Sequence, residues 1–187
     1  DTLSLHDALP IYAVLERVPV RAGDVVVVIG AGPIGILCAI LALSAGARHV
    51  VITGVAEDAG RLEIARQIGA IAVNIDAQDP LKVLQTLQAD GADIVYETSG
   101  VASTLEQAVG MTRKGGSVGL IGLCHAGSVF KSTPVVIKEL ALIGSRGYNE
   151  TTWRLMMGVL PQVGEQVLRL VTHQVEFRDF ERALRMV

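Results

Sequence analysis

A glycine-rich turn is the part of this sequence whose residue types and spacing most directly indicate chemistry. The turn consists of Gly30, Ala31, Gly32, Pro33, Ile34 and Gly35. It follows an apolar run at 25–29 and precedes a helical pattern at 34–44. In a strand–turn–helix setting, the first glycine permits a tight turn, the second lets backbone approach a pyrophosphate, and the third lets helix and strand pack closely. The helix N-terminus adds free N–H groups and a partial positive charge. The pattern therefore predicts a dinucleotide-binding site.

The residue that contacts the adenosine ribose in such sites is normally an acid about 20 positions further on, at the end of the second strand. Here Gly54 occupies that place, with Glu57 and Asp58 a few residues into the loop. Without the acid, the repulsion that excludes a 2′-phosphate is also lost, and Arg61 or Arg66 could pair with such a phosphate. Glu57 or Asp58 could instead do the acid's work. Solvated surface charges explain the same residues equally well, so the choice between NAD and NADP stays open.

Three further segments, 97–100, 122–123 and 144–146, end predicted strands at the same sheet edge as the glycine turn. Open α/β sheets bind ligands at this edge. The cofactor contacts that we expect in these segments are Ser99, Gly122, Leu123, Ser145 and Arg146. Small residues and free backbone groups there could line the nicotinamide half of a cofactor. Ordinary turns between strand and helix account for each single segment as well.

The elements that must position these residues follow from apolar runs that alternate with helical patterns. The predicted strands are 25–29, 50–52, 72–75, 94–96, 117–121 and 140–144, and the predicted helices include 34–44, 61–68, one that opens at Pro80, and 104–111. This order predicts an α/β fold with a doubly wound parallel sheet of the Rossmann type, about six strands with helices on both faces.

Composition excludes several other classes of protein. Of 187 residues, 50% are hydrophobic and 19% charged, which is incompatible with intrinsic disorder. A net charge of −3 argues against a nucleic-acid partner. The uncharged run 25–47 is long enough to span a bilayer, but its glycines and Pro33 would break a continuous helix, so we expect no membrane span.

Side chains for catalysis or metal binding are not grouped in this sequence. Cys38 and Cys124 have no CxxC partner, and we expect both to be buried in a reducing cytoplasm. The four histidines show no metal-binding spacing, and no tyrosine is followed four residues later by lysine. We therefore predict no catalytic or metal-ligating residue in this chain, and the missing Tyr-x-x-x-Lys excludes a short-chain dehydrogenase.

Five segments occur in a specific order within 12–187: VVVVIGAGPIGILCAILALSAGARHVVIT, RLEIARQIGA, DIVYETSG, GGSVGLIGL and KELALIGS. In this order they resemble the medium-chain dehydrogenase/reductase superfamily, most closely its zinc-dependent polyol branch of sorbitol and threonine dehydrogenase-like enzymes. The resemblance implies a two-domain cytoplasmic enzyme, a homodimer or homotetramer, that oxidises a secondary alcohol. Hydride passes to NAD or NADP while a catalytic zinc polarises the alcohol.

Position by position, the resemblance assigns the pyrophosphate turn to 30–35 and the family arginine near the ribose to Arg61. It also implies nicotinamide-side contacts at Gly122, Leu123, Ser145 and Arg146. The sequence departs from the family at Gly54, which replaces the NAD-selecting aspartate, and in the loop before Arg61, which is about two residues longer.

Both ends of the sequence carry expectations of their own. Residues 2–11, TLSLHDALPI, resemble one reading frame of a sequencing adapter, so we expect 1–11 to be foreign and the native chain to begin near Tyr12. We expect 12–187 to be a Rossmann domain truncated at both ends of a longer enzyme, with the zinc ligands in a missing N-terminal domain. A zinc-free quinone reductase of the same superfamily and a non-catalytic nucleotide-sensing module are the alternatives.

Overall fold

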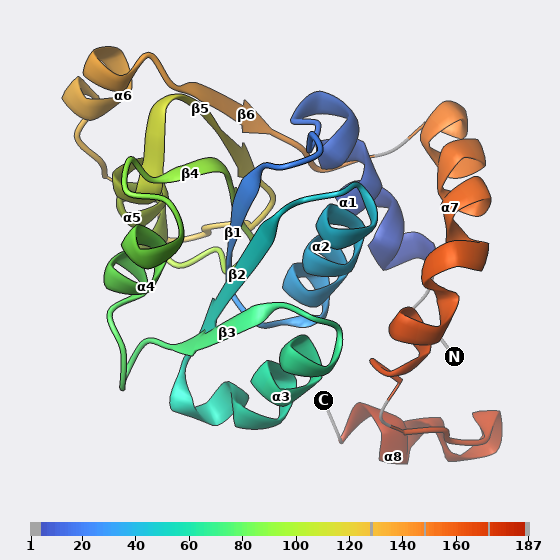
Figure 1. Ribbon diagram of the computed structural model, residues 1–187. Coiled ribbons are helices and arrows are strands. Elements are labelled where there is room, and N and C mark those ends of the chain that lie inside the picture. The colour runs from blue at the N-terminus through green and yellow to red at the C-terminus, as the bar shows by residue number, and fades with distance from the viewer. Residues whose placement is uncertain (1–4, 128, 148, 172, 186–187) are drawn as a thin grey trace.

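A parallel sheet forms the centre of the computed structural model, which describes residues 5–127, 129–147, 149–171 and 173–185. The strands are β1 (Val25–Ile29), β2 (His49–Gly54), β3 (Ile71–Asn74), β4 (Ala92–Glu97), β5 (Thr112–Leu120) and β6 (Ala141–Gly144). They form one six-stranded sheet in the order β3-β2-β1-β4-β5-β6, and every neighbouring pair is parallel (Figure 1). The predicted Rossmann-type sheet is confirmed.

The central strand β1 shows why a continuous aliphatic run becomes a strand here. All five of its residues are buried, and Val27 pairs with Val51 on one side and with Val95 on the other. Since helices cover both faces of the sheet, alternate residues along the strand contribute to two separate apolar clusters.

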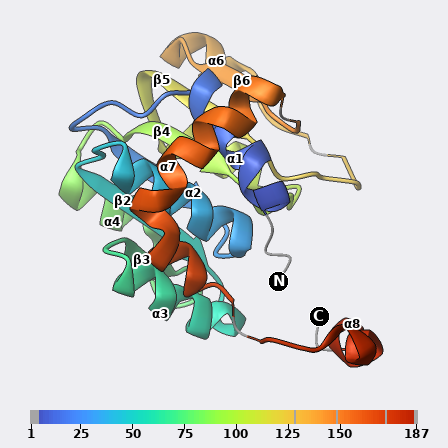
Figure 2. The same cartoon turned by 90° about the vertical axis from the view of Figure 1, so that its right-hand side faces the viewer.

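Helices lie on both faces of the sheet, as predicted. One face packs against α1 (Leu5–Arg17), α2 (Pro33–Ser44), α3 (Ala59–Gln67) and α7 (Glu150–Leu168), and the other against α4 (Pro80–Leu87) and α5 (Thr104–Met111). The remaining elements are the short turn η1 (Ala56–Asp58), α6 (Thr133–Lys138) beside β5, η2 (Phe177–Asp179) and α8 (Phe180–Leu184). Figure 2 shows α8 lying apart from the sheet, beyond the end of α7.

Two helices begin at a proline. Pro80 opens α4, as the sequence predicts, and Pro33 opens α2 one residue before the predicted start at 34. The missing proline N–H costs nothing there, because the first helical N–H has no partner within the helix. The Asp79 carboxylate also accepts a hydrogen bond from Leu81 N at 2.9 Å, which caps α4.

The first described helix, α1, was not predicted from the sequence. It begins inside the segment expected to be foreign, and Ile11 and Val14 are fully buried in the core. Tyr96 Oη anchors the end of this region by donating to Val18 O at 2.6 Å. Residues 1–4 lie outside the described residues, and the foreign origin of 1–11 stays a prediction that long-read resequencing would test.

The two cysteines differ in their surroundings. Cys38 is fully buried, as predicted, and burial raises the pKa of its thiol. Cys124 is only partly buried, and its Sγ donates to Gly127 O at 3.3 Å, so the prediction of burial is wrong for this residue. It lies after the end of β5, where the chain leaves the sheet. Within the described ranges, no helix combines the length and apolarity needed to cross a bilayer.

Candidate functional site

The glycine turn is held between the ends of three strands. Gly30 has a φ of +109°, a conformation that favours glycine, and its N–H donates to Thr53 O at 3.0 Å. A Cβ atom on Gly30 would lie 3.0 Å from Thr98 Oγ1. Thr98 Oγ1 in turn donates to Ile29 O at 2.9 Å. The turn after β1 is therefore fixed by contacts from β2 and from the loop after β4.

The other two glycines of the turn have opposite surroundings. A Cβ on Gly35 would overlap the carbonyl oxygen of Gly30, so α2 packs against the turn only because this residue has no side chain. A Cβ on Gly32 would have no atom within 4 Å. Gly32 is the N-cap of α2 and the first turn of that helix holds no acidic residue. The first N–H groups of α2 therefore have open space at Gly32 and no acidic residue in their own turn, which is the setting in which helix N-termini bind phosphate groups.

The residues predicted from separate strand ends lie along one edge of the sheet. Gly122 N donates to Glu97 O at 3.0 Å, and Ser145 N donates to Leu120 O at 2.9 Å. The first bond joins the loop after β5 to the end of β4, and the second joins the loop after β6 to the end of β5. Leu123 is 55% exposed, and Arg146 is also exposed. Because parallel strands place their carboxyl ends together, Gly30, Gly54, Ser99, Gly122 and Ser145 share this edge. Their contacts with a cofactor stay predictions.

The sequence placed Glu97, the last residue of β4, in the segment 97–100 but assigned it no role. Its side chain is only 4% exposed. Glu97 Oε1 accepts hydrogen bonds from Ser99 N at 2.8 Å, Ser99 Oγ at 2.6 Å and Gly100 N at 3.0 Å. It also accepts from Thr104 Oγ1 at 2.9 Å. A carboxylate with several donors stabilises a loop strongly, so Glu97 fixes the loop that contacts Gly30. The sequence signal that could have indicated this role is an acidic residue directly after a run of apolar strand residues.

At the ribose end of the site, Gly54 is buried against the glycine turn. A Cβ on Gly54 would lie 2.9 Å from Ala31 Cβ and 3.1 Å from Asp58 Oδ2. Arg61 Nη1 donates to Asp58 Oδ1 at 3.0 Å, and the Arg61 side chain is 57% exposed. Of the two acids left open by the sequence, the structure brings Asp58 beside Gly54 and leaves Glu57 exposed.

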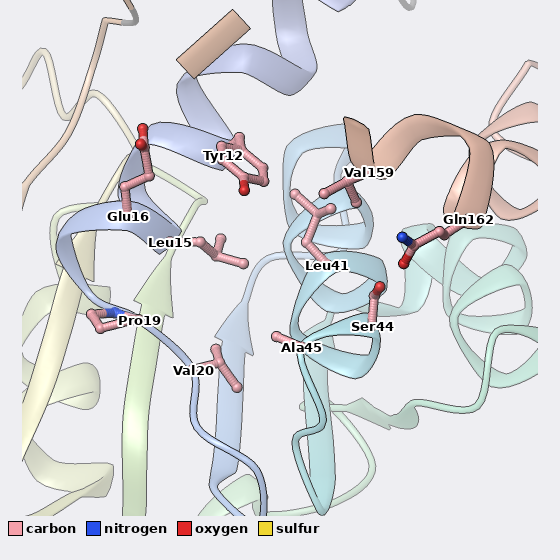
Figure 3. A pocket seen from close by; sticks show the side chains of 10 residues that line it. All are labelled: Tyr12, Leu15, Glu16, Pro19, Val20, Leu41, Ser44, Ala45, Val159 and Gln162. Carbon is pink, nitrogen blue, oxygen red and sulfur yellow. The ribbon is translucent and has the colours of Figure 1, made fainter. Parts of the chain in front are cut away.

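A separate cavity of about 280 Å³ lies among α1, α2 and α7, away from the glycine turn (Figure 3). Its lining residues are Tyr12, Leu15, Glu16, Pro19, Val20, Leu41, Ser44, Ala45, Val159 and Gln162. It touches the last turn of α2, roughly 12 Å along the helix axis from Pro33. None of the predicted cofactor contacts lines this cavity.

No group of three or more histidine, cysteine, aspartate or glutamate side chains in the described ranges could hold a metal ion. The described residues therefore do not fit a zinc site.

The strand order, the glycine turn and the small residues along the carboxyl edge together define a Rossmann-type nucleotide-binding domain. Comparison with known proteins narrows this class. A family described as zinc-binding dehydrogenase matches residues 33–161, which is more than half of the chain. The chain belongs to the zinc-binding dehydrogenase family, and the predicted resemblance to medium-chain dehydrogenases is confirmed.

Similar curated proteins are dehydrogenases of about twice this length. L-threonine 3-dehydrogenase of Bacillus subtilis is 33% identical over 181 residues, covering 95% of this chain and 51% of the relative. Sorbitol dehydrogenase of Halalkalibacterium halodurans is 33% identical over 173 residues, covering 90% of this chain and 50% of the relative. The chain thus spans about half the length of the curated relatives it matches.

Similar solved structures include alcohol dehydrogenase TADH from Thermus sp. ATN1, with a TM-score of 0.85 and 28% identity. That match covers 96% of this chain and 52% of the other. A putative zinc-binding dehydrogenase from Sinorhizobium meliloti, solved bound to NADP, has a TM-score of 0.76 and 26% identity. It covers 84% of this chain and 47% of the other.

Proposed function

We propose that this chain is the cofactor-binding part of a dehydrogenase that transfers hydride from a secondary alcohol or polyol to NAD or NADP. The observation that carries the proposal is the contrast between Gly35, where no side chain fits, and Gly32, where nothing fills the space. That contrast is what a backbone cradle for a pyrophosphate requires. The threonine, sorbitol and alcohol dehydrogenases among its relatives support the alcohol substrate.

The residues of this chain bind and orient the cofactor. The first turn of α2 donates N–H groups to the pyrophosphate, and Glu97 holds the 98–100 loop beside the turn. A bound NAD or NADP would supply the hydride acceptor for the alcohol carbon, and the hydroxyl proton would pass to solvent as the ketone forms. The described residues include no zinc ligand set, and their proposed roles are to bind and orient the cofactor. A small-molecule alcohol substrate, a homodimer or homotetramer and a cytoplasmic location belong to the same proposal.

The substitution Gly32→Asp tests the cradle directly. Position 32 has room for a side chain and is a helix N-cap, where aspartate is favoured. The fold should therefore keep its thermal midpoint, while a carboxylate in the phosphate space should lower the affinity for dinucleotide by roughly a hundredfold. Calorimetric titration with NAD⁺ and NADP⁺ measures the affinity, and a thermal melt checks the fold.

Gly158→Asp is the matched control, since Gly158 is exposed on α7 and also has open space around it. This variant should bind dinucleotide like the unaltered chain. The proposal is wrong if the folded unaltered chain gives no heat with either dinucleotide at millimolar concentration. It is also wrong if Gly32→Asp binds as tightly as Gly158→Asp.

A further inference from the structure

We propose that Asp58 makes this site selective for NAD over NADP by supplying, from the loop, the carboxylate that Gly54 lacks. The inference rests on the proposed function, since it names which dinucleotide the same site takes. In dinucleotide sites of this fold, an acid at the end of the second strand accepts the ribose 2′-hydroxyl and repels a 2′-phosphate. Gly54 ends β2 at that place and has no side chain to do either.

The Asp58 side chain occupies the space that a side chain at position 54 would need. A Cβ on Gly54 would lie 3.1 Å from Asp58 Oδ2 and 3.2 Å from Asp58 Cβ. The same Cβ would lie 2.9 Å from Ala31 Cβ, within the glycine turn. The Asp58 carboxylate is therefore beside the turn at the end of β2. The glycine at 54 and the acid at 58 are complementary, because a larger residue at 54 would displace the carboxylate.

The loop after β2 returns the acid to this place. The turn η1 reverses the chain directly after β2, and Asp58 Oδ2 accepts from Val55 N at 3.3 Å. Ala56 N donates to Asp76 Oδ2 at 2.8 Å, and Ile75 N donates to Gly54 O at 2.9 Å. The loop is thus tied at two points to the segment after β3. Asp58 is positioned by the fold and is not a side chain sampling solvent freely, as only 18% of it is exposed.

The local charge also opposes a 2′-phosphate. Glu57, Asp58 and Asp76 are all acidic and lie in or against this loop. Arg61 pairs with Asp58 at 3.0 Å, and Arg66 pairs with Glu63 at 3.2 Å. The three acids outnumber the one arginine that pairs within this loop, so a 2′-phosphate would meet a net negative charge. A carboxylate oxygen can accept more than one hydrogen bond, so Asp58 can accept from a ribose hydroxyl while it stays paired with Arg61.

The test is calorimetric titration of the 187-residue chain with NAD⁺ and NADP⁺, in parallel with the Asp58→Asn variant. The unaltered chain should bind NAD⁺ at least about tenfold more tightly than NADP⁺, because a hydrogen bond to a charged acceptor is worth about that factor. Asp58→Asn should reduce that ratio by about tenfold, with most of the change in NADP⁺ affinity. In the double variant Asp58→Asn/Arg61→Gln, the ratio of NAD⁺ to NADP⁺ affinity should also be near one. This result would show that Asp58→Asn acts by removing a repulsive charge and not by freeing Arg61 to bind the phosphate.

One control locates the effect. Glu57→Gln removes the same charge from the neighbouring exposed residue and should leave the preference for NAD⁺ intact. A ratio that Asp58→Asn leaves unchanged, or that Glu57→Gln changes by as much, overturns the inference while the proposed function stands. An unaltered chain that favours NADP⁺ does the same. Folded protein that binds neither dinucleotide overturns both.

Discussion

The two ends of strand β4 each carry a carboxylate, and the two carboxylates are used differently. Asp93 and Glu97 lie four residues apart, which is roughly 13 Å along a strand. Asp93, near the amino end, pairs with the Arg113 guanidinium and accepts a hydrogen bond from Val25 N at the start of β1. Glu97, at the carboxyl end, binds backbone N–H groups and hydroxyls of its own loop. One strand thus stabilises the fold at one end and shapes the candidate site at the other.

At the amino end, Asp93 joins three elements. Its carboxylate accepts from Val25 N at 2.8 Å, Gln88 Nε2 at 3.2 Å and Arg113 Nε at 2.6 Å. Burial raises the pKa of Asp93, but these hydrogen bonds and the Arg113 charge outweigh it and leave the pKa below its ordinary value. All these contacts are internal to the fold. The amino end therefore offers closed, mutually satisfied groups.

At the carboxyl end, the Glu97 carboxylate accepts hydrogen bonds from the loop backbone and does not cover the glycine turn. Glu97 holds the 98–100 loop, and Thr98 of that loop contacts Gly30. Beside them, Gly32 faces open space. The difference teaches that a buried acid can position a binding edge without facing the ligand itself.

The largest effect is expected from Glu97→Ala. Glu97 is buried, and removing its carboxylate leaves donors of Ser99, Gly100 and the buried Thr104 without their shared acceptor, which should cost about 3 kcal/mol of unfolding free energy. The 98–100 loop should also lose its position, so dinucleotide affinity should fall. Urea denaturation and calorimetry measure the two quantities. Glu97→Gln keeps one acceptor oxygen, so its unfolding free energy should lie between those of Glu97→Ala and the unaltered chain. A Glu97→Ala variant as stable as the unaltered chain would contradict this role of Glu97.

A smaller and purely structural effect is expected from Asp93→Ala. Loss of the contacts to Val25, Gln88 and Arg113 should lower the unfolding free energy by about 2 kcal/mol. Dinucleotide affinity of the folded variant should stay within twofold of the unaltered chain, because Asp93 is at the far end of the strand. Weaker binding by Asp93→Ala than by Glu97→Ala would reverse the comparison of the two ends.

The smallest effect is a pH dependence at the amino end. Since the folded pKa of Asp93 is lowered, its contribution to stability is complete above the unfolded value of about 3.9 and is lost as pH falls through the folded value. The unaltered chain should therefore lose stability more steeply than Asp93→Asn below about pH 4. Urea midpoints of both proteins measured from pH 7 down to pH 3 provide the check. Parallel curves would show that Asp93 does not contribute in this way.

Much of the sheet could be predicted because buried parallel strands are continuous aliphatic runs. The prediction for 25–29 matches β1 in both bounds. The strands 50–52 and 94–96 were predicted too short, because polar residues such as His49 and Glu97 belong to the strands through backbone pairing, and Asp93 lies within β4 at a shift in register. Helices α1, α6, α7 and α8 were not predicted. Pro10 within α1 and Pro161 within α7 interrupt patterns that tertiary packing nevertheless holds as helices.

The candidate site was predicted where its function depends on residues close in sequence. The turn at 30–35 carries its own spacing, so its position was foreseen. Asp58 was one of two acids that the sequence left open, and Glu97 lay in a segment that the sequence singled out. Which of their atoms contact Gly54 and Gly100 depends on how each loop turns, and residue spacing does not contain that information.

The most direct test of the central claim, that the carboxyl edge binds the dinucleotide, is an amide NMR titration of the chain with NAD⁺. We predict shifts at Gly32, Ile34, Gly35 and Gly100, with none at Val25 or Asp93 of the amino end. Shifts confined to the amino end, or to the cavity among α1, α2 and α7, would contradict the account.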